Sequence, residues 1–147
     1  LYAWYEQMIL SGDIQKSFPF EDGGMAQLSL SAFLGNFQEP TVLLHEGDDK
    51  GWWFCLWAKP SYIGSADVHL WIREGKRHTK DARNAVLLGL QALLHQFPML
   101  LALTSDETIA KEHEKVGFTR LGSLPTENGL VYVTYLTREN FAAQQAA

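Results

Sequence analysis

The sequence predicts one α/β layered domain, in which helices flank a mixed, mainly antiparallel sheet. Two helical segments come first, three strand-like apolar segments follow, and helical and strand-like segments then alternate to the end. A length of 147 residues is enough to bury a core without disulfides or metals. We expect this single domain at residues 1–137, followed by an Ala/Gln-rich tail at 138–147 that is frayed or weakly helical.

The N-terminal half is predicted to form two helices and a hairpin. The first helix covers residues 1–10 and ends at Ser11-Gly12, and the second covers 25–37. The strand candidates are Thr41–His45, Trp52–Ala58 and Ala66–Arg73. The glycine- and aspartate-rich turn between the first two strands favours a hairpin. Both faces of Trp52–Ala58 are apolar, which favours a central place in the sheet.

The C-terminal half alternates helices with strands. A long helix at 79–96 begins at Thr79, a candidate N-cap, and ends before Pro98. The remaining elements are the strand Leu100–Thr104, the helix Asp106–Val116, and the strands Phe118–Leu121 and Leu130–Leu136. The last of these is a candidate sheet edge, and an exposed edge strand provides a route to a homodimer.

Composition excludes several classes of function. A formal net charge of −5 argues against a general nucleic-acid binder. The lone cysteine, Cys55, excludes an internal disulfide and a Cys-based zinc site, and its apolar setting predicts a small buried residue. The five histidines are scattered singly, so we expect no metal site. The most apolar stretch, 86–103, contains Gln91, His95 and Pro98, which favours a helix followed by a strand over a membrane span.

The start of the sequence bears on the compartment. No basic-then-apolar signal pattern opens the chain, so we expect a cytoplasmic protein without a membrane partner. Because the first residue is Leu1, we also expect an initiator Met or a short leader before it.

Positive charge is concentrated in one turn of this acidic chain. Five of its 12 Lys and Arg residues fall within positions 73–83: Arg73, Lys76, Arg77, Lys80 and Arg83, with His78 among them. Here the strand at 66–73 gives way to the helix at 79–96. A helix N-terminus offers free N–H groups and the positive end of the helix dipole, and basic side chains strengthen such an anion site. The turn therefore indicates a phosphate-sized site, with a solvated charged loop as the alternative.

This order of elements, with an anion-suited turn before the long helix, resembles that of the GNAT-type N-acetyltransferases. The likeness is carried by residues 66–121, and the strand order extends it to 1–137. The closest match is Ala110-Lys-Glu-His-Glu-Lys-Val-Gly-Phe118, which is similar to a late helix of the family that contains a Tyr and ends in Glu-Lys-Leu-Gly-Phe. The family's acyl-CoA loop reads Arg or Gln, two residues, Gly, one residue, then Gly or Ala, and aligns with Arg77 to Ala82.

The resemblance implies binding of acetyl-CoA or a related acyl-CoA at the 76–83 turn, and transfer of the acyl group to an amine. The cofactor-binding residues that it implies are Arg77, His78, Thr79, Lys80, Ala82 and Arg83, together with the backbone near Leu70 and Ile72 for the thioester carbonyl. The acceptor, a small-molecule or protein amine, is left open.

The sequence departs from the family at two positions. Lys80 stands where the family has a Gly that lets the backbone approach the pyrophosphate; a lysine there either supplies charge or fills the space. His113 stands where the family has a Tyr that protonates the leaving thiolate of CoA. Histidine transfers protons near neutral pH, so His113 is a candidate catalytic residue, with an exposed surface histidine as the alternative.

The resemblance implies that the general base, which removes a proton from the amine, is reached from the central strands. His69 is the first candidate, because it lies within a strand near the expected acetyl group, and a half-buried histidine satisfied by a neighbour is the alternative. Asp67 and Glu46 are further candidates.

Two other interpretations remain open. The departures at Lys80 and His113 also fit a protein that keeps the GNAT fold as a binding or structural module without catalysis, for example in a phage, since glycine-poor loops of this kind resemble those of divergent phage-encoded members. The third interpretation is a site for a different phosphate ligand at the same helix start. Whether the chain is an enzyme is therefore open.

Overall fold

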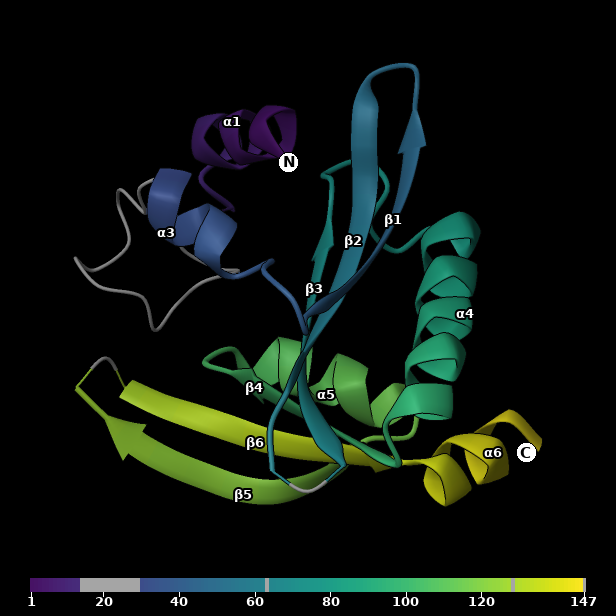
Figure 1. Ribbon diagram of the computed structural model, residues 1–147. Helices are drawn as coiled ribbons and strands as arrows, with labels where there is room; N and C mark the ends of the chain where they lie inside the picture. Colours follow the sequence, from purple (N-terminus) through teal and green to yellow (C-terminus); the bar gives the residue numbers. More distant parts are fainter. Residues whose placement is uncertain (14–29, 63, 128, 147) are drawn as a thin grey trace. The chain divides into compact units, whose positions relative to one another are not determined.

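The computed structural model describes residues 1–13, 30–62, 64–127 and 129–146 (Figure 1). In chain order the elements are α1 (Tyr2–Ser11), α3 (Leu30–Gly35), β1 (Val42–Asp48), β2 (Gly51–Pro60), β3 (Ser65–Ile72), α4 (Lys80–Gln96), β4 (Met99–Thr104), α5 (Glu107–Lys115), β5 (Thr119–Thr126), β6 (Gly129–Thr137) and α6 (Arg138–Ala146). The first part of the predicted helix at 25–37, residues 25–29, lies outside the described residues.

The strands form one sheet in the order β1-β2-β3-β4-β6-β5. The strands β3 and β4 run parallel, with Ser65–Asp67 opposite Met99–Leu101, and β1–β2, β4–β6 and β5–β6 are antiparallel pairs. This confirms the predicted fold class, a mixed and mainly antiparallel sheet in an α/β protein.

The chain divides into two compact units. The first contains Leu1–Ala58 and His69–Val86, and the second contains Lys59–Val68 and Leu87–Ala147. The prediction of a single domain at 1–137 stays a prediction. Among the described helices, none combines the length and the apolar character that a membrane span requires.

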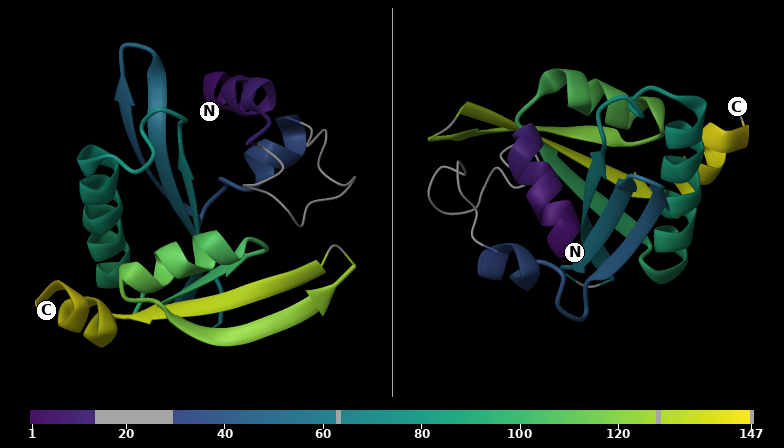
Figure 2. Two further views of the ribbon diagram at one scale, coloured as in Figure 1. Left: turned by 180° about the vertical axis from the view of Figure 1, so that it is seen from behind. Right: turned by 90° about the horizontal axis from the view of Figure 1, so that it is seen from above.

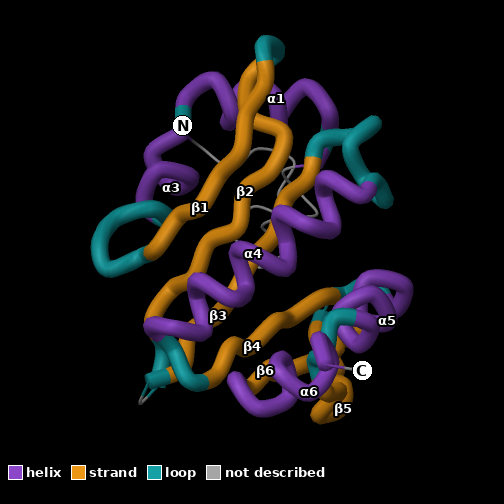
Figure 3. The backbone as a smooth tube through the Cα atoms, turned by 90° about the vertical axis from the view of Figure 1, so that its right-hand side faces the viewer, coloured by secondary structure: helices purple, strands orange, loops and turns teal. Residues whose placement is uncertain are grey.

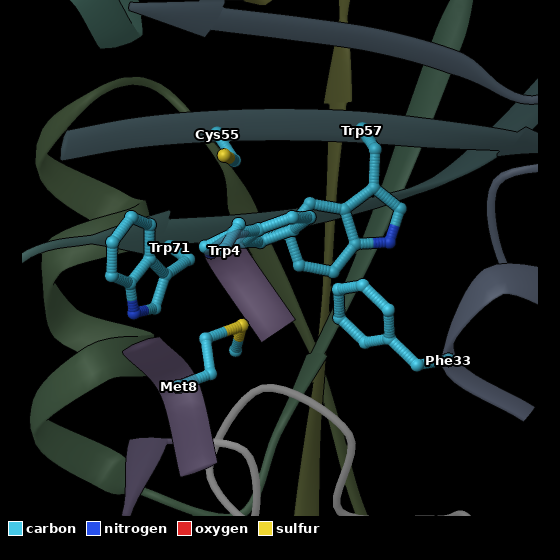
Figure 4. Close-up of a cluster of buried hydrophobic side chains, with 6 residues drawn as sticks. All are labelled: Trp4, Met8, Phe33, Cys55, Trp57 and Trp71. Carbon is cyan, nitrogen blue, oxygen red and sulfur yellow. The ribbon is translucent and has the colours of Figure 1, made fainter. Parts of the chain in front are cut away.

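The core of the first unit is an aromatic cluster centred on Trp4. Its fully buried members are Trp4, Met8, Phe33, Cys55, Trp57 and Trp71. Trp4 and Met8 lie four residues apart on α1, so they share one face of that helix. Figure 4 shows the Trp4 ring between those of Trp71 and Trp57. The Trp4 ring meets Trp57 edge-on, with centroids 5.4 Å apart, so α1 is held by ring contacts with β2 and β3.

The predicted hairpin is confirmed, and it contains a bulge. Asp48 pairs with Gly51 at the turn, but Glu46 lies opposite Phe54 while Gly47 lies opposite Trp52. Trp53 is therefore an extra residue of β2, and such a bulge re-aims the neighbouring side chains. Trp52 packs against Trp4, with ring centroids 5.8 Å apart, whereas the ring of Trp53 lies under the ammonium group of Lys76.

The strand β2 is buried along most of its length, as its apolar faces predict. Every residue from Trp53 to Ala58 is buried. Cys55 is among them and is a free thiol. Burial raises the pKa of this thiol, which keeps it protonated and unreactive at neutral pH. The structure thus agrees with the prediction that Cys55 is a small buried residue.

In the second unit, β6 lies between β4 and β5. Met99 pairs with Thr137 on one side of β6, and Thr126 pairs with Gly129 on the other. The prediction that Leu130–Leu136 is a sheet edge is therefore wrong, because both sides of β6 are paired. The strand at the end of the sheet is β5, which forms a long hairpin with β6 (Figure 2).

The residues at 138–147, predicted as a frayed or weakly helical tail, contain the helix α6. Arg138, its first residue, donates from its guanidinium Nε to the carbonyl oxygen of Leu94 and from an Nη atom to that of His95, at 3.1 Å. These carbonyls belong to the last turn of α4, where the helix itself supplies no N–H donors for them. Figure 3 shows α6 beside this end of α4. Arg138 therefore caps the long helix from the C-terminal segment.

Gly117, the glycine of the Glu-Lys-Val-Gly-Phe motif, joins α5 to β5 with φ of 111°. A Cβ atom there would lie 3.3 Å from side-chain atoms of both Leu136 and Gln144. We expect Gly117→Ala to lower the free energy of unfolding by about 2 kcal/mol, from backbone strain and crowding together. Chemical denaturation would measure this. Gly35→Ala is the matched control, because a Cβ atom there meets nothing within 4 Å, and an equal loss in both variants would contradict the expectation.

Candidate functional site

The basic turn connects β3 to α4 along a defined backbone path. The N–H of Lys76 donates to the carbonyl of Arg73 at 3.0 Å, and the N–H of Thr79 donates to that of Lys76 at 3.3 Å. Gly75 and His78 have positive φ angles, of 91° and 63°. A left-handed conformation is uncommon for a residue other than glycine, and it persists only where surrounding contacts determine it.

Thr79 is the N-cap of α4, as the sequence predicts. Its hydroxyl oxygen accepts from the N–H of Ala82 at 3.2 Å and donates to the carbonyl of Lys76 at 2.6 Å. Ala82 itself is buried against the protein. The cap satisfies one of the N–H groups at the helix start. Within the described part of the chain, the N–H groups of His78, Lys80 and Asp81 have no hydrogen-bond acceptor.

Two basic side chains at the start of α4 are available to a ligand. Lys80 and Arg83 are exposed, and neither forms an ion pair with any described residue. They lie three positions apart, on neighbouring turns of one helix face. The Lys80 side chain is exposed and is not packed into the core. This corner of the first unit therefore offers free N–H groups, the positive end of a helix dipole and two cations.

The other basic side chains of the turn contact the protein. Arg73 forms an ion pair through two hydrogen bonds to Asp48, and these bonds hold the pKa of that carboxyl below its ordinary value. The Lys76 ammonium nitrogen lies 5.2 Å from the ring centroid of Trp53, a cation–π contact. Both contacts join the turn to the β1–β2 hairpin.

Arg77, which the resemblance assigns to the phosphates, is bonded to the protein at two of its nitrogens. Its Nε atom donates to the carbonyl of Ile72 at 2.7 Å, and an Nη atom donates to the carboxylate of Asp13 at 2.8 Å. The same carboxylate oxygen accepts from the indole N–H of Trp71 at 3.0 Å. Sequence reasoning missed Asp13, because a residue that follows a helix C-terminus 64 positions away gives no local signal.

The candidate bases differ in their surroundings. His69 is half-buried, and its ring stacks on Trp57 with centroids 5.3 Å apart and planes at 16°. Asp67 is also half-buried, and burial raises the pKa of its carboxyl, an effect that the charge of Lys59 opposes. Glu46 is exposed on β1. Leu70, on β3 beside His69, exposes 40% of its surface.

His113, in the second unit, is half-buried rather than an exposed surface residue. Its Nδ1 atom lies 3.1 Å from the hydroxyl oxygen of Thr134, and that hydroxyl donates to the carbonyl of Ala102 at 3.3 Å. Because the hydroxyl proton is directed to Ala102, the imidazole proton belongs on Nδ1, and Nε2 is an acceptor. Burial lowers the pKa of His113 to about 4, so the ring is neutral at pH 7.

Among the residues that the structure describes, no three His, Cys, Asp or Glu side chains come together in a way that would hold an ion.

The sequence matches no protein-family model and no curated protein. Solved structures do match. The spermidine N-acetyltransferase of Vibrio cholerae, in complex with CoA and spermine, is similar over 95% of this chain and 91% of its own, with a TM-score of 0.73 and 14% identity. The ribosomal-protein-S18-alanine N-acetyltransferase of Escherichia coli is similar over 90% of this chain and 88% of its own, with a TM-score of 0.65 and 12% identity.

Proposed function

We propose that this chain, which has the fold of the GNAT-type N-acetyltransferases, binds an acyl-CoA at the turn before α4 and transfers the acyl group to an amine. The observation that carries the proposal is the open start of α4, where three N–H groups without acceptors in the described chain lie beside the exposed Lys80 and Arg83. A solved structure of the same fold carries CoA.

The residues of the turn fit a diphosphate. The N–H groups of His78, Lys80 and Asp81 would donate to its oxygens, and Lys80 and Arg83 would supply compensating charge. The side chain of Asp81 bears a like charge, and at this position it complements the helix dipole. The cofactor supplies the activated acyl thioester. With Lys80 directed to solvent, the absence of the family's glycine does not close this site.

For proton removal from the amine, we propose His69. Its ring is held in a fixed plane by the stacking contact with Trp57, which preserves the orientation of its nitrogens. Asp67 is the alternative base, since burial raises the pKa of its carboxyl toward the range where a base exchanges protons readily. The role of His113 as proton donor stays a prediction, and it needs a proton on Nε2 that the neutral ring does not carry.

The acceptor is proposed only as an amine. The neighbours' names specify spermidine in one case and the alanine of a ribosomal protein in the other, so the fold accommodates both small-molecule and protein amines. Cytoplasmic localisation, a phage origin and a homodimer stay predictions from the sequence.

A second candidate function is a GNAT-fold binding module without catalysis. The specific observation in its favour is the hydrogen-bond chain from His113 through Thr134 to Ala102, which leaves no proton on Nε2 for a leaving thiolate. Binding of acetyl-CoA without thiol release in the presence of any amine of a broad acceptor panel would favour this module. Binding of phosphate or nucleotides but not of CoA would favour a different phosphate ligand.

Titration calorimetry with acetyl-CoA tests the proposed site. We expect micromolar binding by the wild-type protein, and a loss of about 1–3 kcal/mol of binding free energy for Lys80→Ala and for Arg83→Ala, because each removes a charge-assisted contact. The matched control is Lys111→Ala, which makes the same change of charge on α5. Unchanged affinity in both turn variants, or an equal loss in the control, would overturn the assignment.

A further inference from the structure

Asp13 is a buried carboxylate at the end of α1. It follows Gly12, whose left-handed conformation ends the helix and turns the chain. Only 6% of the residue is exposed. A carboxylate removed from water in this way needs charged or polar partners to offset its desolvation.

The two partners of Asp13 come from β3 and from the basic turn. A single oxygen, Oδ2, accepts both the indole N–H of Trp71 and an Nη–H of Arg77. Trp71 is itself a member of the aromatic cluster, so the carboxylate is anchored to the core of the first unit. The acceptor position offered to Arg77 is therefore fixed by packed side chains.

Arg77 connects the buried Asp13 to the turn. Its Nε donates to the carbonyl of Ile72, the last residue of β3, so the guanidinium is held both by the strand end and by Asp13. A planar guanidinium with two fixed donors allows one orientation. The residue after Arg77 is His78, which has a left-handed backbone conformation. Its N–H is the first of the three that have no acceptor among the described residues.

The Arg73–Asp48 pair, by contrast, has no buried carboxylate. The side chains of Arg73 and Asp48 are 18% and 27% exposed, whereas that of Asp13 is 8% exposed and that of its partner Arg77 is 35% exposed. Water competes for a pair at the surface and can replace either partner. Among the described ion pairs of the turn, that of Asp13 with Arg77 is the one whose loss would leave a charge buried.

We propose that Asp13 is a positioning residue for the cofactor turn. Acting through Arg77, it holds the turn in the conformation that presents the N–H groups of His78, Lys80 and Asp81 to a diphosphate. The inference rests on the proposed function for its ligand, but the positioning of the turn is measurable without one.

The test combines hydrogen exchange with binding. Asp13→Asn keeps the size and an acceptor oxygen while it removes the charge. We expect amide exchange in residues 76–83 of the free protein to become at least roughly threefold faster, and the affinity for acetyl-CoA to fall about tenfold. Met8→Ala is the control: it creates a cavity in the same cluster without touching the turn, so it should lower the melting temperature and leave both readouts unchanged.

A double-mutant cycle isolates the route through Arg77. In an Arg77→Gln background, Asp13→Asn should have little further effect on exchange or affinity, since its partner in the turn is already gone. Additive effects, or changes in the turn no larger than those of Met8→Ala, would overturn the proposal. If Asp13→Asn lowers the melting temperature too far for exchange to be read, Arg77→Lys provides the measurement with the buried charge still compensated.

The outcomes for the two proposals are distinct. If the wild-type protein does not bind acetyl-CoA, the proposed function fails, and exchange in residues 76–83 still shows whether Asp13 positions the turn. If exchange rises in Asp13→Asn while the affinity for acetyl-CoA is unchanged, the proposed function stands and the inference about Asp13 is overturned.

Discussion

Replacing Trp4 by alanine is expected to lower the free energy of unfolding by about 3–5 kcal/mol, the usual cost of removing a large buried aromatic side chain. Trp4 is 2% exposed and lies at the centre of the aromatic cluster. Its ring contacts are with Phe33, Phe37, Trp52, Trp57 and Trp71, at centroid distances of 5.2–5.8 Å. Few neighbours can collapse into the space it leaves, because most of them are themselves rigid rings.

Urea denaturation followed by far-ultraviolet circular dichroism would measure the effect of Trp4→Ala. The control on the same helix is Leu10→Ala, since Leu10 is 88% exposed and its loss should change stability by no more than about 0.5 kcal/mol. A loss below about 1 kcal/mol for Trp4→Ala would show that α1 contributes little to the core of the first unit.

Acidification is expected to destabilise the fold through His113. Burial lowers the pKa of this ring from 6.5 to about 4 in the folded chain. Between these values the unfolded chain binds more protons than the folded one, so stability decreases as the pH falls from about 6.5 toward 4. The full contribution across that window is about 3 kcal/mol, taking 1.4 kcal/mol for each pH unit of the difference.

The comparison that isolates this contribution is with His113→Gln, because a Gln amide can still donate to Thr134 but does not titrate. Acidification also protonates other groups, and burial raises the pKa of Asp67. The quantity to follow is therefore the difference in unfolding free energy between wild type and variant. We expect the wild type to lose its advantage as the pH falls from 7.5 to 4.5. A difference that stays constant with pH would mean that the pKa of His113 is the same in the folded and the unfolded chain.

The elements that sequence analysis predicts well are those with a clear apolar pattern. In α4 and β4 the apolar residues follow the period of the element, and β2 is an unbroken apolar run. Turn residues such as Gly51 and the cap Thr79 define the ends. The strand β5 extends beyond its predicted end, because most of its residues are exposed and no alternation marks them. The helix α6 has no buried residue, so its Ala/Gln-rich sequence indicates only a tail.

The candidate site shows the same division. The position of the basic turn and its helix cap follow from neighbouring residues, and local sequence is enough to predict them. The engagement of Arg77 depends on Asp13, which no periodicity or spacing connects with it. The burial of His113 likewise depends on Thr134, which is supplied by another strand. Pairings between distant segments are set by tertiary packing, and a single sequence does not reveal them.

The shared oxygen of Asp13 has an evolutionary consequence. A carboxylate at position 13 constrains position 77, because losing the guanidinium alone leaves the buried Asp13 without its charged partner. In lineages that descend from this sequence, positions 13 and 77 should therefore change together, with the tryptophan at 71 retained wherever the acid is retained. The turn before α4 would then be under selection from a residue 64 positions earlier in the chain, outside any motif that describes the turn alone.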